Sequence, residues 1–174
     1  MARVVVLLLV LGLAFPGHAA PASQQSGTFL IVAGTSIGPI SLGMSFEEVL
    51  KLFGHYGSQN VAIPGFPRYI WTELPDNRLV GRFVVSTAGS PASVDAMSVA
   101  SDGRYMTSTG IHIGDPSASV RSIMGAPAAV QTGFYDADIW LYQGIAFTIG
   151  NSNSKQCEGR VCGIGVGRGF AEVF

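Results

Sequence analysis

Charged residues are scarce in this sequence. They make up 12% of its 174 residues, with 10 Lys and Arg against 11 Asp and Glu. No stripe of basic residues runs along the chain, which argues against a nucleic-acid-binding protein. The hydrophobic content of 48% is too high for a disordered chain. The 23 glycines and the many small polar residues favour a β-rich protein whose surface depends on neutral polar groups.

Histidine is also scarce. Beyond the first twenty residues it occurs twice, as His55 and His112. His112 lies between Ile111 and Ile113, an alternation that points its side chain to solvent. His55 follows a predicted helix end, where a cation is favoured. Neither is accompanied by a cysteine nucleophile, a metal-ligand cluster or a paired carboxylate, so the sequence predicts no catalytic residue, no metal site and no cofactor.

The sequence has one long apolar run, at residues 4–15, preceded by a single positive charge and followed by the small residues Ala19 and Ala20. This order is typical of a secretory signal peptide. A run of this length is too short to span a bilayer, and no later segment is long and apolar enough to do so. We therefore expect residues 1–20 to be a signal peptide and residues 21–36 a leader. The mature protein should be exported, to the periplasm or the medium.

The two cysteines, Cys157 and Cys162, are five positions apart. In an oxidising compartment an even, closely spaced pair indicates a structural disulfide. The alternatives are a redox pair or half of a metal site. Redox motifs normally have two residues between the cysteines, and no second pair of ligands stands nearby to complete a zinc site. The spacing favours a disulfide that closes a short loop.

One segment of the chain occurs twice. Ile40–Gly54 aligns without a gap on Ile111–Gly125, and each copy is expected to form a short strand, a glycine turn, a helix and a glycine stop. In the first copy Ser45 and Glu48 form a capping box at the helix start. In the second, Asp115 is expected to cap the helix, with Pro116 at its first position. Both helices carry an apolar face.

Strand patterns follow each helix. The two tryptophans of the chain, Trp71 and Trp140, lie in apolar-aromatic strands at similar distances from the two helix starts. Two further strands follow each of them. The pattern predicts an α+β fold of two tandem β-α-β-β-β repeats, each a helix packed on an antiparallel sheet, with the two sheets joined or packed side by side. Repeat 1 would cover residues 37–107 and repeat 2 residues 108–174.

The repeated motif resembles a known helix-plus-sheet module. As a single copy it is similar to the small lipoprotein of the bacterial outer-membrane assembly machinery, and as a tandem pair to the secreted beta-lactamase inhibitor proteins. The residues that carry the likeness are Ile40, Gly43, Ser45, Val49, Gly54, Ile111, Gly114, Val120, Gly125 and Pro127. The resemblance implies helices on one face of the sheet and an open second face. It transfers no inhibitory residue to this chain.

From these observations we expect an exported, non-catalytic module, either protein-binding or envelope-associated and inhibitor-like in architecture. Its partner would be another extracytoplasmic protein, and its oligomeric state is open. Aromatic residues carry much of the energy of protein interfaces. The candidate protein-binding residues are Tyr69, Trp71, Arg82, Phe134, Tyr135, Trp140 and Tyr142. The alternatives are a small secreted enzyme of hydrolase type and a purely structural envelope component.

Overall fold

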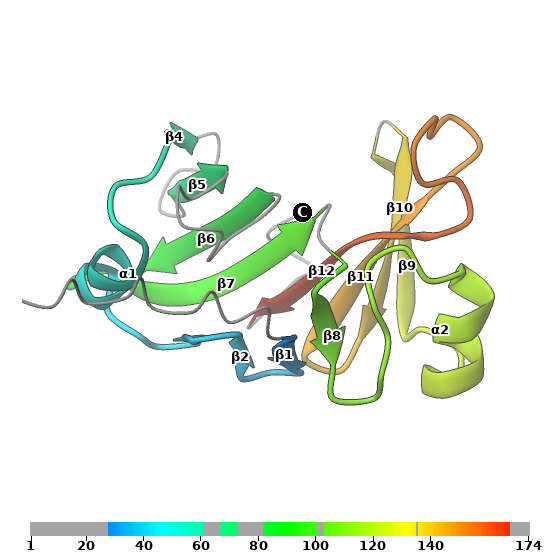
Figure 1. Ribbon diagram of the computed structural model, residues 1–174, viewed down its shortest axis with the longest axis horizontal. Helices are drawn as coiled ribbons and strands as arrows, with labels where there is room; N and C mark the ends of the chain where they lie inside the picture. The colour runs from blue at the N-terminus through cyan, green and yellow to red at the C-terminus, as the bar shows by residue number, and fades with distance from the viewer. Residues whose placement is uncertain (1–27, 61–66, 73–81, 101–102, 135, 168–174) are drawn as a thin grey trace, which may run out of the picture.

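The structure is a computed structural model that describes residues 28–60, 67–72, 82–100, 103–134 and 136–167. The predicted signal peptide lies outside these residues, as do residues 21–27 of the predicted leader. Two short helices lie toward opposite ends of the molecule, with strands between them (Figure 1). Among the described residues, no helix is long and apolar enough to cross a membrane.

The main element is a sheet of eight strands, in which every neighbouring pair is antiparallel. In spatial order its strands are β4 (Ser58–Asn60), β5 (Arg68–Thr72), β6 (Arg82–Ala88), β7 (Ser93–Ala100), β12 (Val161–Gly167), β11 (Ile145–Gly150), β10 (Ala137–Tyr142) and β9 (Ala129–Phe134). The chain runs through β4 to β7 in order on one side and through β9 to β12 on the other. The pairing of β7 with β12 therefore joins the two halves of the sheet.

A second, four-stranded sheet lies between the helices (Figure 1). Its order is β3 (Ile40–Ser41), β2 (Ser36–Ile37), β1 (Phe29–Val32) and β8 (Tyr105–Thr107). β1 and β8 pair in parallel, although more than seventy residues separate them along the chain. The turn after β1 contacts the turn between β10 and β11, where the Gly34 amide donates to the Gly144 carbonyl at 2.7 Å.

Each helix is eight residues long. α1 (Phe46–Phe53) begins at the predicted capping box: the Ser45 hydroxyl accepts from the Glu48 amide, and the Glu48 carboxylate accepts from the Ser45 amide at 3.0 Å. α2 (Ser117–Met124) differs from its prediction, because Pro116 is the N-cap residue and provides no side-chain cap. The Asp115 carboxylate accepts from the His112 amide instead.

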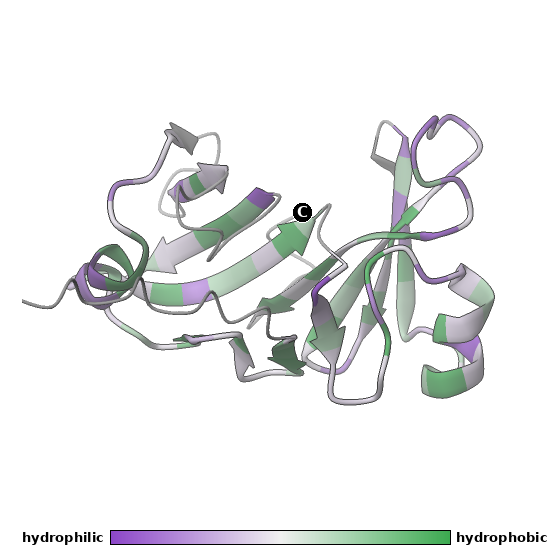
Figure 2. Ribbon diagram, in the orientation of Figure 1, coloured by the Kyte–Doolittle hydropathy of each residue, from purple (hydrophilic) through white to green (hydrophobic). Residues whose placement is uncertain are grey.

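The hydrophobic core lies on one face of the eight-stranded sheet. The large residues of the central strands, among them Phe83, Met97, Ile164 and Phe147, are at most 2% exposed. They form one cluster with residues from both helices and from the small sheet, such as Val49, Val120, Ile31, Ile37 and Tyr105. Strongly hydrophobic and more polar residues alternate along β7 (Figure 2), so the opposite face of this strand carries smaller or more polar side chains.

The predicted fold class is wrong. The described chain is mostly strand, with two short helices and two sheets, and it is not a tandem helix-on-sheet repeat. The opening strand of the first unit, Ile40–Ser41, belongs to the separate small sheet. Residues 111–113 of the second unit form a single bridge, between His112 and Met106, and no strand. β4 and β9, which precede the tryptophan-containing strands β5 and β10, are further strands that the β-α-β-β-β pattern does not include. The boundaries proposed for the two repeats stay a prediction.

The capping box gives a testable stability effect. Ser45→Ala should lower the free energy of unfolding by about 1 kcal/mol, since it leaves helix amides without a partner.

Hydrogen bonds from the Ser45 side chain and backbone lower the pKa of Glu48 below 4.5. A carboxyl with a lowered folded-state pKa stabilises the protein above its unfolded pKa, and this contribution disappears as the pH falls through the lowered value. Urea unfolding at pH 7 and pH 3 should therefore show a smaller effect of the substitution in acid; an equal effect would contradict this account.

Candidate functional site

The face of the eight-stranded sheet opposite the core holds a pocket of about 300 Å³. Five of its central strands and β5 contribute residues to it. Strand register explains which side chains share this face, because residues paired across neighbouring strands point the same way. Arg82 pairs with Ala100, Ala100 with Gly163, and Gly163 with Thr148. A second row, two residues along each strand, runs through Val84, Ser98, Gly165 and Ala146.

The middle of the pocket is formed by small residues, which we call the small-residue floor. It consists of Ser86, Ala96, Ser98, Ala100, Gly163 and Gly165. These residues leave the backbone of β7 and β12 close to the pocket. On β12, a Cβ added at Gly163 would lie 3.0 Å from the Val99 carbonyl oxygen and 3.5 Å from the Ala100 Cβ. The strands approach so closely here that glycine is the residue that fits without a shift.

The two walls of the pocket differ in chemistry. On the β5–β6 side stand Arg68 and Arg82, with Ile70 and Val84. On the β10–β11 side Ile139 and Ala146 are buried against each other, with Leu141 packed on them. No described lining residue is acidic. Burial, and secondly the like charge of Arg82, lower the pKa of Arg68, so this wall carries two cations that repel each other.

Tyr69 and Trp71 point to the core face. Trp71 is 1% exposed, and its indole nitrogen donates to the Gly54 carbonyl at the end of α1 at 3.2 Å. Its ring lies 6.1 Å from that of Phe53. Tyr69 is half-buried, with its ring 3.9 Å from that of Phe46. Both aromatic residues therefore hold α1 on the sheet.

Trp140 and Tyr142 have the same position relative to α2. Trp140 is 8% exposed, with the Arg121 guanidinium 4.5 Å from its ring centre. The Tyr142 hydroxyl donates to the carbonyl of Gly125, at the end of α2, at 3.0 Å. Burial raises the pKa of Tyr142. The role of these aromatics in binding a protein stays a prediction, but their contacts give each a structural role.

Three predicted binding residues remain: Arg82, Phe134 and Tyr135. Arg82 is exposed and lines the pocket. The backbone of Phe134 ends β9, while its side chain and Tyr135 lie outside the described part of the chain. The small-residue floor was missed in the sequence. A signal for it existed in the alternation of small with large residues along β7 and β12.

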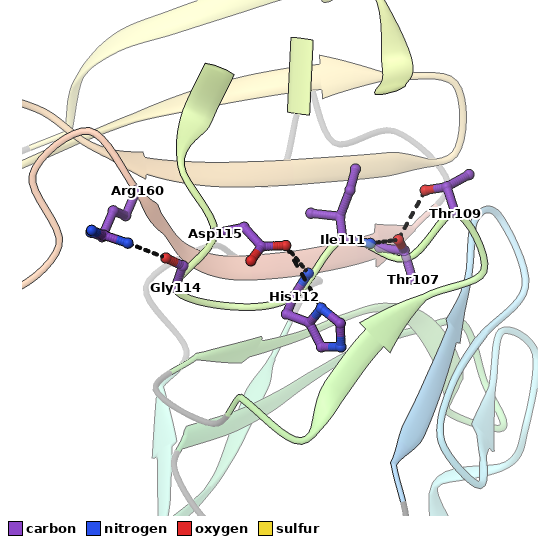
Figure 3. A network of polar contacts seen from close by, with 7 residues as sticks. All are labelled: Thr107, Thr109, Ile111, His112, Gly114, Asp115 and Arg160. Atoms are coloured by element: carbon purple, nitrogen blue, oxygen red, sulfur yellow. Dashed lines mark hydrogen bonds and ion pairs between the residues drawn. The ribbon is translucent and has the colours of Figure 1, made fainter. Parts of the chain in front are cut away.

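Figure 3 shows a polar network at the start of α2. The His112 Nδ1 lies 3.7 Å from the Asp115 carboxylate, whose oxygen also accepts from the His112 amide at 2.8 Å. Arg160 donates to the Gly114 carbonyl at 2.9 Å. These contacts fix the loop that leads into α2.

His55 is elsewhere, following α1, and its ring contact is with Tyr56. The described residues contain no group of three or more His, Cys, Asp or Glu that could hold a metal.

Cys157 and Cys162 form the predicted disulfide, with 5.7 Å between their Cα atoms. The bond joins the loop after β11 to the second residue of β12. Gly150, at the end of β11, packs directly on the Cys157 backbone, since a Cβ there would overlap the Cys157 carbonyl. The disulfide thus holds the long loop against the sheet, on the side where β12 enters it.

No protein-family model and no curated protein matches this chain. Three solved structures are similar to it. An extracellular protein containing a SCP domain, from Bacillus anthracis, has a TM-score of 0.50 at 10% identity, over 72% of this chain and 43% of that one. A DUF4309 family protein from Bacillus subtilis has a TM-score of 0.46 at 12% identity, over 71% and 77%. A cysteine-rich secretory protein from Staphylococcus aureus has a TM-score of 0.47 at 12% identity, over 73% and 44%.

The first likeness concerns the fold alone, and the other two are weaker. This chain spans less than half the length of the first and third proteins. None of the three bears on the resemblance to the beta-lactamase inhibitors or to the assembly lipoprotein, which stays a prediction.

Proposed function

We propose that this protein is an exported, non-catalytic binding protein, and that another extracytoplasmic protein docks on the open face of its eight-stranded sheet. The observation that carries the proposal is the pocket on that face. Concave sites with apolar surface and a few placed polar groups are where proteins bind ligands. Here the small-residue floor gives such a hollow in the middle of a sheet whose other face is fully used by the core.

The chemistry of the lining supports binding rather than catalysis. Arg68 and Arg82 provide positive charge, and Ser86, Ser98 and Thr148 provide hydroxyl groups. A catalytic site needs a base or nucleophile brought together with groups that orient and stabilise the reacting atoms. The described lining includes no His, Asp or Glu that could serve as that base.

Export has independent support. The signal-peptide pattern at residues 1–20 predicts it, and the Cys157–Cys162 disulfide fits an oxidising compartment. The solved structure with a TM-score of 0.50 is described as an extracellular protein, although the likeness concerns the fold.

Filling the pocket tests the proposal. Ser98→Trp puts a large ring on the small-residue floor, from a residue that is half-buried in the wild type. Tagged wild-type protein should capture a partner from the extracytoplasmic fraction of its own cells, and Ser98→Trp should capture at least tenfold less. Ser152→Trp, in the exposed loop after β11, is the matched control and should behave like the wild type. Equal capture by both tryptophan variants, each with a wild-type circular dichroism spectrum, would rule out the pocket as the binding site.

A further inference from the structure

The chemistry of the pocket indicates what kind of segment it accepts. We propose that the pocket takes an extended acidic segment of the partner protein, with one carboxylate held by Arg82 and an apolar side chain two residues away resting on the small-residue floor toward Ile139. This inference deepens the proposed function and depends on it.

Charge complementarity is the first argument. Arg82 is exposed and Arg68 is half-buried, and both line the same wall. The charged form of Arg68 is disfavoured by its burial and, secondly, by the positive charge of Arg82. A carboxylate bound at this wall would offset that repulsion, whatever else Arg68 contacts. Arginine is well suited to this role, since its guanidinium can donate two parallel hydrogen bonds to one carboxylate.

The opposite wall argues for an apolar neighbour of that acid. Ile139 and Ala146 form a small apolar cluster with Leu141, separate from the main core. It lies on the pocket face, across the floor from the arginines. Ile139 and Ala146 are both at most 5% exposed and have no side-chain hydrogen-bonding group, so an acidic side chain placed against them would be left without a partner. A segment that combines an acidic and an apolar side chain matches both walls.

The dimensions fit such a segment. β6 and β11 are three strand spacings apart, about 14 Å. Side chains two residues apart on an extended chain point the same way and are about 7 Å apart, so both fit between the walls. A volume of about 300 Å³ is at the lower limit for small-molecule sites, which suits one or two inserted side chains better than a whole cofactor.

A partner segment in this pocket must be recognised through side chains. The strands that form the floor, β6, β7 and β12, are hydrogen-bonded to a neighbour on both edges. Their backbone groups are therefore already used, and a partner cannot join them as an added strand. A binding mode that relies on β-strand addition would need an edge, which in this sheet means β4 or β9.

The test uses defined peptides and the full mature protein. A blocked peptide Ser-Gly-Glu-Gly-Leu-Gly-Ser is titrated into isotopically labelled protein, and amide shifts report both the site and the dissociation constant. The expected shifts lie on β6, β7, β12 and β11. A matched peptide with Gln in place of Glu should bind about tenfold more weakly, because it loses the charge-assisted hydrogen bonds. Raising the salt concentration should weaken binding of the acidic peptide and leave that of the Gln peptide unchanged.

Charge reversal provides the second arm. Arg82→Glu should weaken binding of the acidic peptide by more than tenfold and should favour a peptide with Lys in place of Glu. Lys155→Glu makes the same change of sign on an exposed residue outside the pocket lining, and should have no effect. Arg82→Gln, which adds no negative charge, separates loss of attraction from new repulsion.

Three results would overturn the inference. The Glu and Gln peptides could bind equally well, or the amide shifts caused by the peptide could be confined to strands outside the pocket. In a third titration, octanoate could shift the amides at the pocket while no peptide does. The last would identify a small carboxylate as the occupant. If these occur while Ser98→Trp still abolishes partner capture, the acidic segment is wrong and the proposed function stands. If Ser98→Trp captures as the wild type does, the proposed function itself fails.

Discussion

Trp71→Ala should lower the free energy of unfolding by about 3 to 5 kcal/mol, the range for removing a large aromatic side chain from a core. Trp71 is 1% exposed and lies within about 6 Å, centre to centre, of three rings that belong to α1 or follow it: Phe46, Phe53 and Tyr56. Its removal leaves a cavity at the place where α1 meets β5. The carbonyl of Gly54, the C-cap residue of α1, also loses its indole donor. Since a whole domain is stable by about 5 to 15 kcal/mol, this one change takes up a large part of that margin.

Urea unfolding monitored by circular dichroism measures the effect. Trp71→Phe is the matched control: it keeps a ring in the cluster and should cost clearly less than the alanine change. Trp140→Ala should also cost less than Trp71→Ala, because Trp140 is 8% exposed and is covered by Arg121 instead of by a cluster of rings. If Trp71→Ala kept wild-type stability but lost its partner, the binding role predicted for Trp71 from the sequence would be correct and the structural role described here would be wrong.

Gly144→Ala is the second substitution with a large expected effect, about 3 to 6 kcal/mol. Gly144 has φ of +74°, a conformation that costs an alanine about 1 to 2 kcal/mol. A Cβ there would also lie 2.7 Å from the Gly34 nitrogen and 2.9 Å from the Gly34 Cα. Both neighbours are backbone atoms and cannot rotate away, so the turns must separate, at a cost of about 1 to 3 kcal/mol for overpacking. Separation also breaks the hydrogen bond from Gly34 to Gly144, worth about 1 kcal/mol.

Gly110→Ala is the control that separates the cost of the backbone strain from the cost of the contact with Gly34. Gly110 has φ of +86°, with no atom within 4 Å of the added Cβ, so its substitution should cost the strain alone. Thermal unfolding of the two variants should show Gly144→Ala as the less stable by roughly 2 to 4 kcal/mol, the overpacking and hydrogen-bond contributions together. Equal stability of the two variants would mean that the contact between the sheets contributes nothing to the free energy of unfolding.

Local signals in the sequence predicted local structure well. The capping box at Ser45 and the apolar face of Val49 and Phe53 placed α1 where it lies. The spacing of the two cysteines identified their disulfide. Each of these patterns acts within a few residues, so the sequence alone contains the physical reason for it.

The pairing of distant segments could not be predicted in the same way. Residues 111–113 have a strand-like composition, but the neighbouring backbone leaves room for one bridge. The parallel pair β1–β8 and the edge strand β9 depend on partners supplied by the rest of the fold, and their own residues give little indication of it. The candidate site was missed for a related reason. Alternation along a strand defines two faces without saying which one is covered, so the sequence did not show that Trp71 and Trp140 lie on the face that packs against the core.

The place of β12 in the eight-stranded sheet has a consequence for how the protein forms. β12 is the last strand of the described chain, yet it occupies the middle of the sheet and joins β7 to β11. While the chain is still emerging from the ribosome or a translocation channel, β4 to β7 and β9 to β11 can each form hairpins, but the edges of β7 and β11 stay open until residues 161–167 arrive. Unpaired edges are prone to pair with other chains. The nascent protein therefore passes through an aggregation-prone stage that ends with its final strand, and chaperone binding during synthesis or export should be strongest just before that strand appears.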